Sequence, residues 1–151
     1  VRNDPRGAST PAGLRDRAAI NLRARDISRT YYDVVTALNA IDGVLSEAKE
    51  QLSSDSAAKS LSTEITTLRQ RARGNSITSG IGRLFDLTAA IESSSMPPTD
   101  AQQRSLAASV AEFTEIATKV NDIISSRLPA VLAKAGRTNA PAIASVQTPN
   151  L

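Results

Sequence analysis

The chain of 151 residues contains neither cysteine nor histidine. This excludes thiol and imidazole nucleophiles, the commonest general base, and most zinc and haem ligands. It also excludes the Glu-x-x-His motif of di-metal helical bundles. Because no disulfide can form, cysteine usage says nothing about the redox compartment. We therefore expect no catalytic residues, no metal and no cofactor, and predict that the protein is not an enzyme.

Aromatic residues and long apolar runs are also scarce. Aromatics make up 3% of the chain, and tryptophan is absent. The core must therefore come mostly from alanine, leucine, isoleucine and valine, which suits close helix packing better than a β-sandwich. The apolar runs are too short for a transmembrane segment. The length predicts one domain, large enough to bury a core.

The main feature present is a long apolar seam. Between residues 10 and 52, apolar side chains recur in alternating steps of four and three, which indicates a helix with one buried face. Thr10 followed by Pro11 is typical of a helix start. We therefore predict a helix over 11–52, roughly 60 Å long at 1.5 Å per residue. The seam consists of Ile20, Ala24, Ile27, Tyr31, Val34, Leu38, Ile41, Leu45, Ala48 and Leu52, and we expect its central part, Ile27 to Leu45, to form the core.

The same spacing predicts three further helices, over 56–73, 77–93 and 100–135. Gly74 stands where a helix C′ glycine is common, and Thr99 with Gln102 fits a capping box. Pro129 should kink the last helix.

The two ends of the chain lack this spacing. Residues 1–9 are polar and contain Pro5 and Gly7, so we expect an extended junction there. We expect residues 137–151 to be non-helical, with Ala142–Val146 as an extended strap.

The predicted fold is all-α, an elongated antiparallel bundle. If the second and third helices form one rod broken near 74–78, the molecule consists of three long rods. If the chain instead reverses at Gly74, it is a four-helix up-down bundle. We favour three rods because the long seam needs cover over its full length.

Positive charge gathers near the start of the chain. Residues 1–29 hold seven arginines and three aspartates, a net of +4, whereas the whole chain carries +3. Cations near a helix N-terminus oppose its dipole. A solvated face is one interpretation, and a docking end for an acidic partner is the other. Little lysine and no interleaved aromatics argue against nucleic acid. The candidate docking residues are Arg2, Arg6, Arg15, Arg17, Arg23, Arg25 and Arg29.

The candidate carboxylates for a catalytic role lie off the predicted seam, as expected for the solvated faces of helices. They are Asp33, Asp42, Glu47, Glu50, Asp86, Glu92, Glu112 and Glu115. Gly80-Ile81-Gly82-Arg83 lacks a third glycine and a preceding strand, so it indicates a close helix contact rather than a phosphate loop.

Three short segments carry a family resemblance. Asn3–Arg6 and Thr10–Arg15, leading into the long helix, resemble the passage that closes bacterial sortilin-type β-propeller proteins. These are exported proteins with neuraminidase-like repeats, often labelled glycosyl hydrolase-like or photosystem-stability-like. Gly82–Ser93 followed by Pro98–Gln102 is similar to the segment after the propeller, and Leu128–Leu132 with Gly136 resembles the closing helix.

This resemblance implies a C-terminal helical accessory domain whose propeller lies upstream, so no catalytic residue is carried over. It implies a periplasmic or secreted location. Together with the arginine-rich end, it suggests a non-enzymatic assembly module that docks on the acidic surface of a larger protein complex, such as an energy-converting, photosynthetic membrane complex. A cap on its own propeller and a sensor-like periplasmic four-helix bundle are alternatives, and a carboxylate-based hydrolase is a third. The start at Val1 agrees with a processed or excised domain.

Overall fold

The computed structural model describes residues 10–74, 79–94, 96–137 and 141–149. In these ranges all regular structure is helical, which confirms the all-α class. The elements are α1 (Pro11–Glu47), α2 (Ser56–Arg73), α3 (Gly80–Glu92), α4 (Asp100–Asp122), the π-helical turn η1 (Ile123–Arg127) and α5 (Leu128–Lys134). The predicted junction at residues 1–9 lies outside the described residues.

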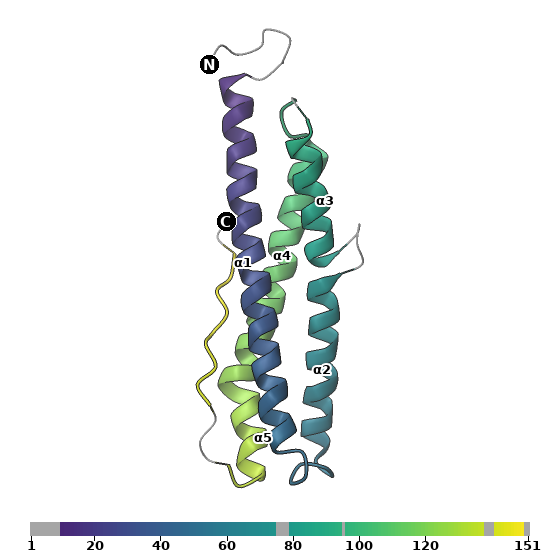
Figure 1. Cartoon of the computed structure of the whole chain (residues 1–151), viewed down its shortest axis with the longest axis vertical. Helices are drawn as coiled ribbons and strands as arrows, with labels where there is room; N and C mark the ends of the chain where they lie inside the picture. Colours follow the sequence, from purple (N-terminus) through teal and green to yellow (C-terminus); the bar gives the residue numbers. More distant parts are fainter. Residues whose placement is uncertain (1–9, 75–78, 95, 138–140, 150–151) are drawn as a thin grey trace.

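The helices form three long rods (Figure 1). α1 is the first rod, α2 and α3 follow each other end to end as the second, and α4, η1 and α5 form the third. The middle rod runs opposite to the other two, and both of its halves contact α1 and α4. The chain therefore continues in one direction past Gly74, as the three-rod prediction required.

Two helices begin at the capping residues that the sequence indicated, and Asp55 caps the start of α2. The Thr10 hydroxyl accepts a hydrogen bond from Gly13 N at 3.1 Å, and the Asp55 carboxylate accepts one from Ala58 N at 2.9 Å. The capping box at the start of α4 is complete, because Thr99 N donates to Gln102 Oε1 at 2.8 Å and Gln102 N donates to Thr99 Oγ1 at 3.3 Å. These caps satisfy amides that a helix start leaves without a partner.

Two glycines make the break in the middle rod possible. Gly74 and Gly80 have φ values of 66° and 61°, in the left-handed region that favours glycine. A Cβ on Gly74 would lie 1.9 Å from Ser79 O, and one on Gly80 would lie 2.6 Å from Gly74 N. The ends of α2 and α3 approach this closely only without side chains there. The predicted helix start at residue 77 lies outside the described residues, and α3 begins at Gly80.

The first helix ends earlier than predicted, since α1 stops at Glu47 and not at Leu52. Beyond Glu47 the backbone forms turns, in which Lys49 N donates to Ser46 O at 3.3 Å. Ala48 and Leu52 nevertheless stay buried at the end of the bundle. The apolar pattern therefore continues past the helix, which is why spacing alone placed the boundary too late.

The distortion caused by Pro129 also lies upstream of its predicted place. A proline lacks an N–H and its ring crowds the carbonyl four residues earlier. The chain accommodates this through η1, where Leu128 N donates to Ile123 O, five residues back. The predicted kink at 129 is thus a widened turn over Ile123–Arg127.

The core follows the predicted seam with one exception. Ile27, Val34, Leu38 and Ile41 are fully buried and Leu45 is nearly so. Tyr31 is only half-buried, at the edge of the core, where its ring meets Phe113 edge to face with 6.3 Å between centroids. Its phenol group keeps access to water in this position.

Candidate functional site

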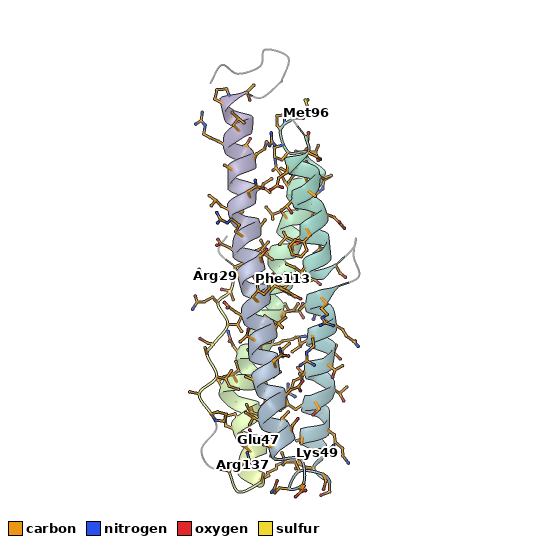
Figure 2. The ribbon with its side chains drawn as sticks, in the orientation of Figure 1. Arg29, Glu47, Lys49, Met96, Phe113 and Arg137 are labelled. Atoms are coloured by element: carbon orange, nitrogen blue, oxygen red, sulfur yellow. The ribbon has the colours of Figure 1, made fainter. Side chains whose placement is uncertain are left out.

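Six of the seven ion pairs among the described residues join different rods, and the seventh, Lys119–Glu115, lies within α4. Each pair among the described residues takes its cation from residues 69–137. They are Arg69–Asp42, Arg71–Glu115, Arg83–Glu112, Lys119–Glu115, Arg127–Glu64, Lys134–Asp55 and Arg137–Glu47. Figure 2 shows Glu47 and Arg137 side by side at one end of the molecule, with 3.0 Å between Arg137 Nη1 and Glu47 Oε2. These charged side chains therefore stabilise the packing of the helices.

The most enclosed pair stands at the joint of the middle rod. Arg83 Nη2 donates to Glu112 Oε2 at 2.9 Å, and Gly80 N donates to the same oxygen at 3.1 Å. Arg83 Nε donates to the hydroxyl of the fully buried Ser109 at 3.1 Å. Glu112 was interpreted as part of a solvated face, and this is wrong, because its side chain is 17% exposed. It caps α3 and fastens it to α4, so the glycine motif at residue 80 is indeed a helix contact.

Two carboxyl groups have lowered pKa values for the same kind of reason. Hydrogen bonds from Arg71 and then Lys119 lower the pKa of Glu115 to about 2. The Lys134 ammonium and the Ala58 amide lower the pKa of Asp55. Each group is stabilised in its charged form by a cation of a neighbouring element. Neither shift marks a base poised for catalysis near neutral pH.

The structure does not bring the seven candidate arginines to one surface. Arg2 and Arg6 lie outside the described residues. Arg17 turns toward the end of α3, where its Nη2 donates to Glu92 O at 3.4 Å. Arg23 lines a groove between α1 and α4. Arg15, Arg25 and Arg29 are exposed, and no carboxylate of the described residues lies within ion-pair distance of them.

These exposed arginines share a helix face with large apolar side chains. With 100° per residue, Arg15, Arg25 and Arg29 lie on the side of α1 opposite the core. Leu14, Leu22 and Tyr32 lie on the same side and are 44%, 60% and 62% exposed. We call these six residues the outer face of α1. Figure 2 shows Arg29 on the side of α1 away from α2 and α3, whereas Phe113 lies between the helices.

A second surface is built around the C-terminal strap, residues 141–149, which follows α1 upward from the α5 end (Figure 1). Asn121 of α4 pairs with the backbone of Val146, accepting from its N at 2.8 Å and donating to its O at 2.9 Å. Thr30 of α1 donates to Gln147 O at 3.0 Å. The Val146 side chain is buried. The sequence suggested an extended strap, but its binding place was not predicted. The one signal that could have indicated it is Thr30, a polar residue that the structure buries beside the seam.

Beyond the strap, a groove of about 820 Å³ continues between α1 and α4. Thr148 and Pro149 form one end of it. Its other lining residues are Asp16, Ala19, Ile20, Arg23, Gln103, Leu106, Ala107, Val110, Ala111, Thr114 and Glu115. Among these residues only Arg23 was predicted to take part in docking, because a groove between two helices has no periodicity of its own.

The described residues contain no group of three or more acidic side chains placed to hold a metal ion. Within the same ranges, every helix is too short or too polar to traverse a lipid bilayer, in agreement with the prediction of no transmembrane segment.

No family model, no curated protein and no solved structure matches this chain. The resemblance to sortilin-type propeller proteins therefore stays a prediction.

Proposed function

We propose that this chain is a non-enzymatic interaction module that docks on an acidic protein surface through the outer face of α1. The observation that supports the proposal is that exposed arginines and exposed apolar side chains occur together on this face. Three exposed guanidinium groups without a carboxylate partner among the described residues lie beside three large exposed apolar side chains. Lone exposed apolar residues are ordinary, but their grouping with arginine is typical of binding surfaces.

The physical roles of the two residue types differ. Leu22 and Tyr32 would lose contact with water on docking, at about 25 cal/mol per Å² of buried apolar area. The arginines would raise the association rate and the specificity for an acidic partner more than they would raise the affinity. Arginine suits this role because its planar group binds a carboxylate through two parallel hydrogen bonds.

The test compares the full chain with a variant carrying Arg15→Gln, Arg25→Gln and Arg29→Gln. Both are immobilised and exposed to an extract of the source cells at about 0.1 M and about 1 M salt, where the screening lengths are about 10 Å and 3 Å. We expect one acidic protein to be retained at low salt by the wild type, and to be lost at high salt and from the variant.

The matched control removes the same charge elsewhere, through Lys49→Gln, Lys59→Gln and Arg73→Gln, three exposed cations distant from the outer face. It should retain the partner. Equal loss from both variants would show a general charge effect, and retention of nothing at low salt would also refute the proposal.

From the family resemblance alone we also propose that the module acts outside the cytoplasm, as an accessory domain of a larger complex. An antibody against this domain, used on fractionated source cells, should detect the gene product in the periplasmic or secreted fraction. Detection only in the cytosol would contradict this.

A further inference from the structure

We propose that the groove between α1 and α4 binds an extended peptide of a partner protein, one that presents a branched apolar residue and an acidic residue. This site is separate from the outer face of α1, so the proposal does not depend on the function proposed above. It rests on how the same two helices already hold the strap.

The strap shows that α1 and α4 are suited to extended backbone. Asn121 forms both hydrogen bonds that a neighbouring β-strand would offer to Val146, with distances of 2.8 and 2.9 Å. Thr30 from the opposite helix donates to the next carbonyl, that of Gln147. The Val146 side chain is inserted between the helices and only 4% exposed. Backbone bonds combined with one buried anchor are a common mode of peptide recognition.

The groove continues this binding surface. Thr148 and Pro149 of the strap form its lower end, and the same two helices form its walls. A second extended segment would therefore lie in line with the strap and contact α1 and α4 as the strap does. From Gln103 to Glu115 the α4 wall spans about 18 Å, which matches five or six extended residues at about 3.3 Å each.

The lining of the groove determines what the peptide carries. Ile20, Leu106 and Val110 provide an apolar surface for an anchor such as valine or isoleucine. The small side chains of Ala19, Ala107 and Ala111 let a peptide backbone come close. Gln103 can then pair with the peptide backbone as Asn121 pairs with the strap. The Thr114 hydroxyl already donates to Val110 O at 2.8 Å, so it would accept a hydrogen bond from a peptide N–H.

The charged residues of the groove determine which end of a bound peptide should be acidic. Arg23 has no carboxylate within ion-pair distance among the described residues, whereas Glu115 on the opposite wall is paired with Arg71 and Lys119. An acidic residue of the peptide would pair with Arg23. Asp16 lies two helical turns nearer the start of α1, so the far end of the peptide should be neutral or basic.

The experiment selects binders from phage-displayed random peptides of about seven residues, slightly longer than the groove. The immobilised full chain is compared with Ala111→Tyr, which fills the groove from an exposed wall position, and with Ala108→Tyr, an exposed alanine of α4 outside the groove. Both variants are first melted to confirm that they fold.

We expect enriched peptides to carry valine or isoleucine together with aspartate or glutamate, and to bind wild type and Ala108→Tyr but not Ala111→Tyr. Arg23→Gln should weaken binding of a selected synthetic peptide about tenfold, the loss of roughly one charge-assisted hydrogen bond. Arg25→Gln on the outer face should leave it unchanged.

Absence of enrichment, or equal binding to Ala111→Tyr, would overturn the proposal. So would a peptide that binds as a helix, measured by circular dichroism. If sedimentation instead shows a dimer of the chain that Ala111→Tyr dissociates, the occupant is a second copy and the peptide proposal is wrong.

Discussion

Replacing Glu112 by alanine should destabilise the joint between α2 and α3. One carboxylate oxygen of Glu112 accepts hydrogen bonds from the Gly80 amide and the Arg83 guanidinium. The pair is the most enclosed of the described ion pairs, with side chains 17% and 19% exposed. Removal of the carboxylate therefore takes away both the cap of α3 and its tie to α4.

The magnitude follows from these two bonds. A hydrogen bond that involves a charged group contributes about 1.5–3 kcal/mol, and water entering the truncated site recovers part of the loss. We expect a decrease of about 3 kcal/mol in the free energy of unfolding. For a chain of this length each kcal/mol lowers Tm by about 2–4 °C, so Tm should fall by about 6–12 °C.

The assay is thermal unfolding followed by circular dichroism, together with hydrogen exchange. Exchange should accelerate at the amides of Gly80 and Arg83, which donate to Glu112 and to Ser79 O, while the amides in the middle of α2 keep their protection. Glu112→Gln retains an acceptor without the charge and should lose about half as much stability. Glu115→Ala is the control on the same helix, since Glu115 is exposed and its pairs are screened by water.

If Glu112→Ala lowered Tm no more than Glu115→Ala, Glu112 would not hold the joint as its hydrogen bonds indicate. Faster exchange spread evenly over the bundle would also contradict this role, because the joint would then not unfold on its own.

Gly43→Ala should raise the free energy of unfolding by about 0.5–1 kcal/mol, because the site is helical, exposed and empty within 4 Å of a new Cβ. Gly74→Ala should lower it instead, since φ is 66° and the Cβ would meet Ser79 O at 1.9 Å; urea unfolding of the two variants checks this, and equal effects would contradict it. For pH, the pKa of Glu115 falls from its ordinary 4.5 to about 2, so its pairs stabilise the fold above pH 4.5 and lose this effect as pH falls toward 2. The Tm difference between wild type and Glu115→Gln should therefore vanish over that pH range, and a constant difference would refute the assignment.

Local signals in the sequence were sufficient to predict that the helices form and where α1, α2 and α4 begin. The seam of α1, the cap at Thr10 and the capping box at Thr99 depend on residues within one or two turns of each other. Such contacts are visible as spacing. The full burial of Leu38 and Ile41 follows from the same periodicity, because a narrow apolar seam needs cover.

The interaction surfaces were only partly predictable. Arg25 and Arg29 were identified by their charge, but their grouping with Leu22 and Tyr32 emerges only once the core side of α1 is known. The groove was not predicted at all, because its walls come from residues 16–23 and 103–115, and no local pattern relates them.

By itself, the sequence determined that this protein is an all-α bundle with one long seam, because apolar spacing and caps act within a helix. Tertiary structure decided the rest. It placed Glu112 against Gly80 and Arg83, so that two helices form one broken rod. It also bound the strap to Asn121 of α4 and formed the groove between α1 and α4 beyond the strap. These features depend on contacts between residues distant in the chain, whose geometry is fixed only when the rods pack together.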